Sequence, residues 1–215
     1  MSVIWTTDAI LEHATALGPE RLAVVLGEDG SHLSYGELNA RATRLANALI
    51  AHGASTGERV AVLMENNLDY IVTYHGVARA GAIFVPIVTQ SKLPEIEFFV
   101  SHAEPWVLIV DGERWDVIAE AIAARNPAFV SLREIWLAGE GQRAGLITMA
   151  TVMAAASSTM PVTRPQPQDA VAFMYTSGST GRPKAVIHSH YTAVAQAEAV
   201  CSRMVYTSED RLLQR

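Results

Sequence analysis

Short aliphatic runs alternate with stretches of helical periodicity in the first half of the chain. The run Arg59–Met64 precedes a segment, Leu68–Ala80, whose apolar residues recur as on one face of a helix. Gly81, which tolerates the backbone conformation that ends helices, separates this segment from a second aliphatic run, Ala82–Ile87. A strand, a helix and a strand in this order predict a βαβ unit.

The alternation continues beyond this unit. A further helix is expected from Ser91, with Pro94 near its first turn, and Pro105 ends it before the aliphatic strand Trp106–Val110. Residues 113–125 have helical spacing again. Strands that are aliphatic throughout and separated by helices are typical of a parallel sheet buried on both faces. The predicted fold class is therefore α/β, with a mainly parallel sheet and helices on both faces.

The amino-terminal region predicts a helix and a hairpin ahead of this alternation. A helix is expected after Thr6 and Thr7, and two short apolar runs flank Asp29 and Gly30, a pair that suits a tight strand reversal. Ser34, followed three residues later by a glutamate, forms a capping box ahead of a helix that Gly53 ends.

A proline-rich segment, residues 157–169, divides the chain. Its sequence, SSTMPVTRPQPQD, can continue neither a helix nor a central strand, so we interpret it as a connector between an N-terminal α/β subdomain, residues 1–156, and the start of a second α/β segment, residues 170–215. In that second segment we expect a strand at Ala170–Tyr175, strand character again at Ala185–Ile187, and a long helix at about Ser189–Val205.

Composition and charge exclude several classes of protein. The 215 residues are 50% hydrophobic with a formal net charge of −6, so the chain can bury a core but has no basic surface to attract DNA or anionic lipid. The most apolar window, Tyr70–Val88, is interrupted by His75, Arg79, Gly81 and Pro86, so it is not expected to span a membrane. Cys201 has no second cysteine to pair with, and we expect it to be a small buried helix residue. A cytoplasmic protein with neither nucleic acid nor a membrane as partner is expected.

Candidate chemistry lies in residues 176–184, TSGSTGRPK, which follow Tyr175. Glycines let backbone N–H groups converge on an anion, hydroxyls donate further hydrogen bonds, and Lys184 brings a mobile positive charge, so the composition suits a polyphosphate. Its spacing differs from that of the common NTPase loop, because Arg182 and Pro183 separate the last glycine from Lys184. The alternative is a polar turn that only connects two strands.

The string YTSGSTGRPKAVIHSH, residues 175–190, closely resembles the signature of the adenylate-forming (ANL) superfamily of acyl-CoA synthetases, peptide-synthetase adenylation domains and luciferases. Residues 33–87 resemble the opening segment of the same superfamily. Ala185 departs from the pattern, since the superfamily more often has glycine after the lysine. The resemblance implies that Lys184 is catalytic and that the following residues bind the phosphates together with it: Thr176, Ser177, Gly178, Ser179, Thr180 and Gly181.

The activity implied by this resemblance is that of an ATP-dependent acid–thiol ligase, an acyl-CoA synthetase of the kind used in fatty acid metabolism. Such an enzyme forms an acyl-adenylate from a carboxylic acid and MgATP, then passes the acyl group to a thiol, commonly CoA. We expect this chain to be an N-terminal portion, inactive alone, with ATP, Mg²⁺ and CoA as cofactors, no metal-ligating residue of its own and possible oligomerisation. The alternatives are a nucleotide- or pyrophosphate-binding module without catalysis and an adenylation domain of a peptide synthetase.

Other conspicuous residues are interpreted as structural. His188 and His190 are two residues apart, so they cannot easily share one ligand, and packing at the strand end or a helix cap is the expected role. We expect the Tyr175 ring to fill the core side of its strand rather than contact a nucleotide. Arg182 could contact phosphate or remain a solvated charge. His75 is expected to pack or to touch solvent.

Overall fold

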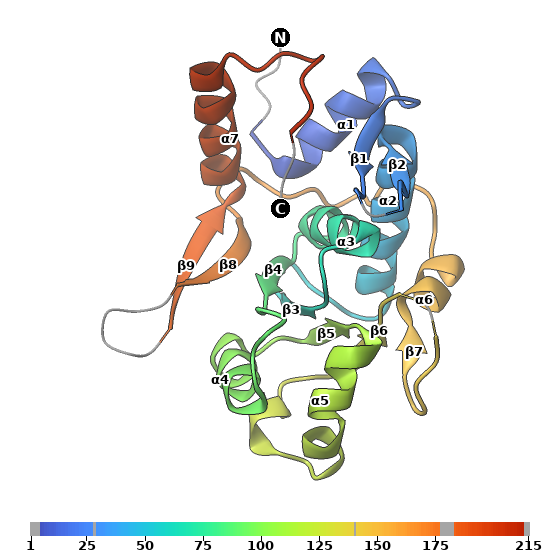
Figure 1. The fold of residues 1–215 in the computed structure, drawn as a ribbon, viewed down its shortest axis with the longest axis vertical. Helices are drawn as coiled ribbons and strands as arrows, with labels where there is room; N and C mark the ends of the chain where they lie inside the picture. The colour runs from blue at the N-terminus through green and yellow to red at the C-terminus, as the bar shows by residue number, and fades with distance from the viewer. Residues whose placement is uncertain (1–4, 28, 140, 177–182, 213–215) are drawn as a thin grey trace.

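A seven-stranded sheet crosses the centre of the structure (Figure 1). The computed structural model describes residues 5–27, 29–139, 141–176 and 183–212. Within these residues the strand order is β7-β6-β5-β3-β4-β8-β9, and every pairing is parallel except that of β8 with β9. The strands are β3 (Arg59–Leu63), β4 (Ile83–Pro86), β5 (Val107–Val110), β6 (Glu134–Leu137), β7 (Ile147–Thr148), β8 (Ala170–Thr176) and β9 (Lys184–Ser189).

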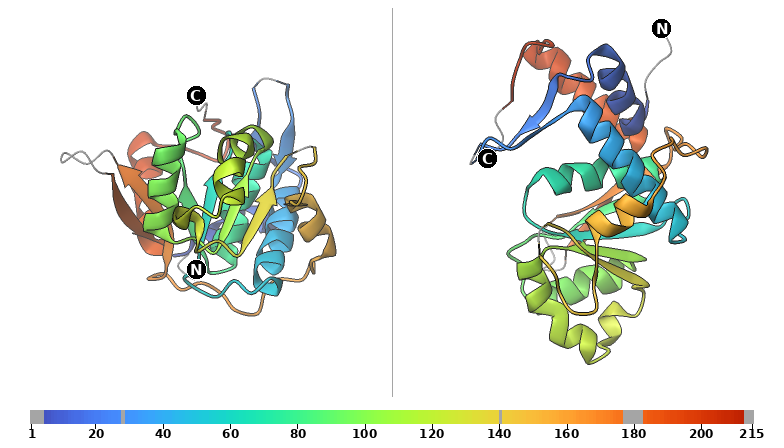
Figure 2. Two further views of the ribbon diagram at one scale, coloured as in Figure 1. Left: turned by 90° about the horizontal axis from the view of Figure 1, so that it is seen from below. Right: turned by 90° about the vertical axis from the view of Figure 1, so that its right-hand side faces the viewer.

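Helices cover both faces of this sheet, as the sequence predicted. Along β3, Val60 and Val62 belong to one core cluster while Ala61 and Leu63 belong to another, because successive side chains of a strand point to opposite faces. The first cluster is covered by α2 (Tyr35–Ala51) and α3 (Leu68–Arg79), and the second by α4 (Leu93–Ala103) and α5 (Gly112–Ala123). Figure 2 shows these two layers of helices on opposite sides of the strands.

The predicted βαβ unit is present as β3, α3 and β4. Asn67 caps α3 by accepting a hydrogen bond from the backbone N–H of Tyr70 at 2.9 Å. Gly81 has φ +73°, the left-handed conformation that lets the chain turn from α3 into β4. Strands β3 and β4 then pair in parallel from Arg59 to Val62.

The amino-terminal elements also match the prediction. Helix α1 (Thr7–Leu17) precedes an antiparallel pair, β1 (Leu22–Val25) and β2 (His32–Ser34), which forms a separate two-stranded sheet. The capping box at Ser34 is complete, since its hydroxyl accepts from the Glu37 N–H and the Glu37 carboxylate accepts from the Ser34 N–H.

A buried ion network joins α1 to α2 and α3, and the sequence analysis did not foresee it. Arg79 is completely buried and donates to the Asp8 carboxylate at 2.6 Å, to the Thr43 hydroxyl at 2.6 Å and to both Asn39 oxygens. The second oxygen of Asp8 accepts from Arg164, in the 157–169 segment, at 2.7 Å. This segment is therefore tied to the amino-terminal helix by a charge pair.

The remaining helices are short or peripheral. They are α6 (Met149–Ala155), the 3-10 turn η1 (Pro127–Phe129) and α7 (His190–Met204). No helix in the described part of the chain has the length and apolarity to cross a membrane. Residues 157–169 contain neither a helix nor a strand, as predicted for a connector, and β8 after them pairs with β4 in the same sheet. The division into two segments remains a prediction.

One expectation about the carboxyl-terminal region was wrong. Cys201 is exposed, not buried, because α7 packs only near its start, where His190 and Val194 are its buried residues. Residues 210–212, after α7, lie outside helices and strands.

Candidate functional site

Strands β8 and β9 form a hairpin whose tip carries the glycine-rich sequence. Cα pairing runs from Ala170 opposite Ser189 to Thr176 opposite Lys184. In Figure 1 this hairpin projects from the edge of the sheet, near α4. Five predicted phosphate-binding residues lie outside the described residues, together with Arg182: Ser177, Gly178, Ser179, Thr180 and Gly181. The described part of the candidate site consists of its two flanks, Thr176 and Lys184.

Thr176 and Lys184 present their side chains on one face of the hairpin. Directly opposed residues of an antiparallel pair share a face, with Cβ atoms about 5 Å apart. Both residues are exposed, so their polar atoms are accessible to a ligand. A hydroxyl and an ammonium at this separation can donate to neighbouring oxygens of one polyphosphate.

Tyr175, next to the loop, packs against helix α4. Its ring centroid lies 4.7 Å from that of Phe99 and 5.6 Å from that of His102. The Tyr175 hydroxyl and His102 Nδ1 are 2.7 Å apart and form a hydrogen bond. Burial raises the pKa of Tyr175. The ring fills the protein side of its strand, as expected from the sequence.

His102 was not singled out by the sequence analysis. Phe98, Phe99 and His102 recur at helical spacing on α4, and the Phe98 and His102 rings stack at 5.6 Å. This aromatic spacing is a signal in the sequence, but it does not identify which strand the helix packs against.

The two histidines after the loop are separated, as predicted. His190 is fully buried at the start of α7, where its Nδ1 accepts from the Thr7 N–H at 3.3 Å and lies 3.0 Å from the Thr7 hydroxyl. Burial lowers the pKa of His190, which favours the neutral ring. His188 is on β9 and only partly buried. His190 therefore joins α7 to α1 and has a packing role.

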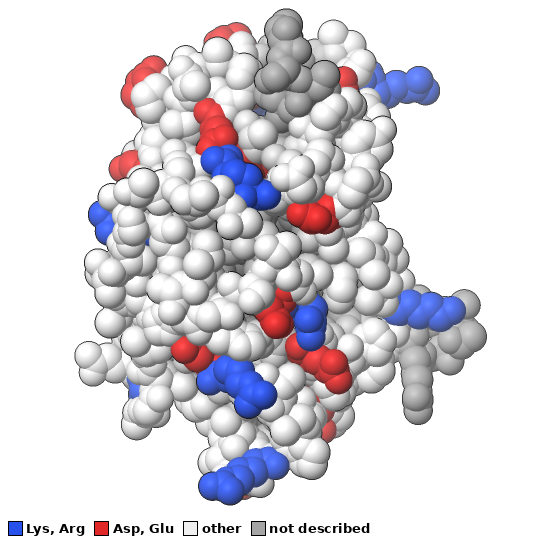
Figure 3. All heavy atoms as spheres, turned by 180° about the vertical axis from the view of Figure 1, so that it is seen from behind, with Lys and Arg blue, Asp and Glu red and all other residues white. Residues whose placement is uncertain are grey.

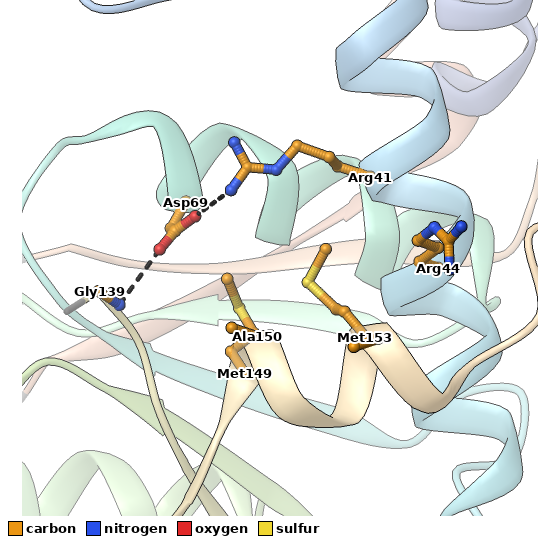
Figure 4. A pocket seen from close by; sticks show the side chains of 8 residues that line it. Arg41, Arg44, Asp69, Gly139, Met149, Ala150 and Met153 are labelled. Atoms are coloured by element: carbon orange, nitrogen blue, oxygen red, sulfur yellow. Dashed lines mark hydrogen bonds and ion pairs between the residues drawn. The ribbon is translucent and has the colours of Figure 1, made fainter. Parts of the chain in front are cut away.

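A cavity of about 440 Å³ is lined by residues of α2, α3 and α6 (Figure 4). Asp69 beside it accepts from Arg41 at 2.9 Å and from the Gly139 N–H at 3.1 Å, so the charge of Arg41 is balanced within the protein. The lining residues are Arg41, Arg44, Asp69, Gly139, Met149, Ala150, Met153 and Ala154. This cavity lies near α6, far along the sheet from the β8–β9 hairpin (Figure 1).

Charge is distributed without a single dominant sign on the face shown in Figure 3, where acidic and basic side chains are interspersed. Within the described residues no group of three or more His, Cys, Asp or Glu side chains could hold a metal ion. Thr176 and Lys184 are the described, exposed side chains next to the loop that can donate hydrogen bonds to an anion.

Comparison with known proteins identifies the family. The chain is 31% identical over 204 residues to the long-chain-fatty-acid–CoA ligase FadD13 of Mycobacterium tuberculosis. The aligned region covers 95% of this chain and 39% of FadD13. It is 33% identical to a probable non-canonical nonribosomal peptide synthetase, CymA of Salinispora arenicola, over 99% of this chain and 2% of CymA. The chain thus spans about two fifths of the length of FadD13.

Solved structures agree with the sequence comparison. The crystal structure of the anthranilate CoA ligase AuaEII in complex with anthranoyl-AMP superposes with a TM-score of 0.82 at 26% identity, covering 92% of this chain and 37% of AuaEII. The family described as AMP-binding enzyme matches residues 11–214. The chain belongs to this family of AMP-binding, adenylate-forming enzymes.

Proposed function

We propose that this chain is the N-terminal portion of an ATP-dependent acid–thiol ligase, which activates a carboxylic acid as an acyl-adenylate and transfers the acyl group to CoA. The observation that carries the proposal is the pairing of Thr176 with Lys184 at the base of the signature loop. Ligase relatives support it: FadD13 is a long-chain-fatty-acid–CoA ligase, and AuaEII was crystallised with anthranoyl-AMP.

The two flanking residues suit the electrostatic part of this reaction. ATP supplies the phosphoanhydride whose cleavage to AMP and pyrophosphate drives formation of the acyl-adenylate. The Lys184 ammonium would balance charge on the phosphates, and the Thr176 hydroxyl would hydrogen-bond to an oxygen beside it. A bound carboxylate is already a nucleophile, so alignment and charge stabilisation are the main requirements on the protein.

The metal and the acyl acceptor are proposed on grounds other than Thr176 and Lys184. We propose that Mg²⁺ binds together with the nucleotide, because Mg²⁺ is usually held by one or two carboxylates plus the phosphates of its substrate. CoA is proposed as the acceptor from the relatives named as CoA ligases.

The test is ATP–pyrophosphate exchange by the complete gene product that contains these 215 residues. We expect exchange with a carboxylic acid from a panel of fatty and aromatic acids, and no exchange by the 215-residue chain alone. Lys184→Ala should reduce exchange about 100- to 1000-fold, the range typical when one preorganised electrostatic donor is removed. Lys92→Ala is the matched control, because Lys92 is the other lysine of the sequence and is exposed at the residue before α4.

Two results would contradict this proposal. Absence of exchange with every acid in the panel would refute the ligase function, and pyrophosphate binding without exchange would favour the alternative of a nucleotide-binding module. An unchanged rate in Lys184→Ala would show that the loop does not hold the phosphates.

An adenylation domain of a peptide synthetase is the second candidate, since CymA matches 99% of this chain. Exchange that depends on an amino acid, without release of a CoA thioester, would favour it. Formation of an acyl-CoA that is detected by mass spectrometry would favour the ligase.

A further inference from the structure

The end of the β8–β9 hairpin next to the signature loop has little backbone pairing with the rest of the sheet. Strand β9 lies at the edge of the sheet, and its Val186 and Ile187 side chains are 44% and 64% exposed. Strand β8 pairs with β4 at Phe84 and Ala172, and the described pairing does not extend further along β8. In the described pairing the last four residues of β8 are paired with β9 alone, so side-chain contacts hold this end of the hairpin against the rest of the protein.

Tyr175 supplies such a contact. Alternation along β8 directs Phe173 and Tyr175 to the same face, where both pack on a cluster that contains Val85 and Ala103. The Tyr175 ring also meets Phe99 at 4.7 Å, and its hydroxyl reaches His102 Nδ1 at 2.7 Å. These contacts link the hairpin to helix α4 one residue before Thr176.

The register of β8 against β9 means that the Tyr175 contacts position the residues on both sides of the loop. Tyr175 lies opposite Ala185, the neighbour of Lys184, and Thr176 lies opposite Lys184 itself. Any rotation of the stem about the Ala172 pairing would move Thr176 and Lys184 together. A fixed Tyr175 therefore fixes both flanking residues relative to the sheet.

We propose that the hydrogen bond between the Tyr175 hydroxyl and His102 Nδ1 is a positioning contact that holds the end of the β8–β9 stem against α4. The proposal rests on the proposed function in that this stem presents Thr176 and Lys184 to a polyphosphate. His102 is accordingly a positioning residue that acts through Tyr175 and does not itself touch the nucleotide.

Amide hydrogen exchange of the 215-residue chain, followed by NMR, tests the contact directly. Tyr175→Phe and His102→Leu each remove the hydrogen bond and should accelerate exchange of the stem amides of residues 175, 176, 184 and 185 about fivefold, the value of one net hydrogen bond. The amides of Val60–Val62 in β3 report global opening and should change little. Tyr70→Phe is the control, because it removes a tyrosine hydroxyl from a ring that packs on Phe84 in the core.

A conservative variant separates positioning from general packing. In His102→Asn the side-chain amide places an acceptor close to the position of Nδ1, so exchange of the stem amides should return toward that of the unaltered chain. Equal acceleration in His102→Asn and His102→Leu would overturn the proposal. So would equal acceleration of the stem and β3 amides, or no acceleration in Tyr175→Phe.

Inorganic pyrophosphate distinguishes this proposal from the proposed function. If the stem amides respond to the variants as expected but pyrophosphate shifts no resonance of Thr176 or Lys184, the positioning contact stands and the phosphate-binding role of the hairpin fails. If pyrophosphate shifts these resonances but the variants leave stem exchange unchanged, the phosphate-binding role stands and the positioning contact fails.

Discussion

Replacing Asp8 by asparagine should be among the most destabilising single changes in the described part of the chain. Asp8 is 1% exposed and balances the charge of Arg79, which is fully buried. Asp8→Asn keeps the side-chain volume but removes the negative charge. Breaking a buried ion pair from one side generally costs about 3–5 kcal/mol, because the other charge is left uncompensated.

The structure places Asp8→Asn near the lower end of this range. Arg79 keeps its hydrogen bonds to the Thr43 hydroxyl and to the two oxygens of Asn39, and the new amide oxygen can still accept one bond from it. Arg164, partly exposed, keeps its ion pair with Glu12 at 2.7 Å. We therefore expect a loss of about 3 kcal/mol in the free energy of unfolding.

Urea unfolding followed by circular dichroism measures this loss, with the m-value held constant between variants. Glu113→Gln is the control, because it removes the 84% exposed partner of Arg114 and should cost no more than about 0.5 kcal/mol. The double variant Asp8→Leu with Arg79→Met should lose less than the sum of the two single changes, since no charge remains buried. A loss below about 1 kcal/mol in Asp8→Asn, or additive losses, would refute the view that the pair is buried and mutually dependent.

Three further changes test the packing, the capping and the pH response of the fold. Gly76→Ala places a Cβ 2.8 Å from Leu45 Cβ, so α2 and α3 must move apart. The free energy of unfolding, measured with urea, should fall by about 1–2 kcal/mol, although alanine has the better helix propensity. Ser34→Ala removes the capping hydroxyl of α2 and should cost about 1 kcal/mol in the same assay, whereas an unchanged midpoint would show that the cap contributes nothing. Burial lowers the pKa of His75 from 6.5 to about 4, so the unfolded state binds the proton more readily and stability should rise with pH between about 4 and 6.5, by up to about 3 kcal/mol. His75→Leu should flatten this part of the profile of unfolding midpoint against pH, and an identical slope in the variant would exclude His75 as its source.

Elements that depend on local sequence were predicted well. The βαβ unit followed from aliphatic runs on either side of a helical period, and the start of α2 and the end of α3 followed from Ser34 and Gly81. Caps and left-handed glycines act within a few residues of themselves, so their signal is present in the sequence that surrounds them. The two strands around the signature loop were anticipated from the apolar residues before Thr176 and after Lys184, but their antiparallel pairing was not.

Features that depend on contacts between distant residues could not be predicted in this way. Asp8 and Arg79 are 71 residues apart, and Tyr175 and His102 are 73 residues apart, so no local pattern joins either pair. Arg79 was noted only as an interruption of an apolar window, although its burial among Asp8, Thr43 and Asn39 makes it a central polar residue of the fold. The prediction that Cys201 is buried was wrong because helical periodicity alone does not show whether another element covers that part of α7.

The candidate site lies at the carboxyl edge of the sheet, where β8 ends. In open parallel sheets ligands commonly bind beyond the carboxyl ends of the strands, where the strand order reverses. Here the order reverses between β3 and β5, where the Asp111 carboxylate accepts from the Glu65 N–H at 3.1 Å and Arg114 pairs with the carboxylates of Glu65 and Asp111. Strand β8 runs parallel to β4, so its carboxyl end, Thr176, points to the same edge of the sheet, and Thr176 and Lys184 are exposed there. Because Thr176 and Lys184 lie beyond the pairing of β8 with β4, that pairing alone does not fix their orientation, and the contact between Tyr175 and α4 therefore matters for a site whose proposed chemistry depends on alignment.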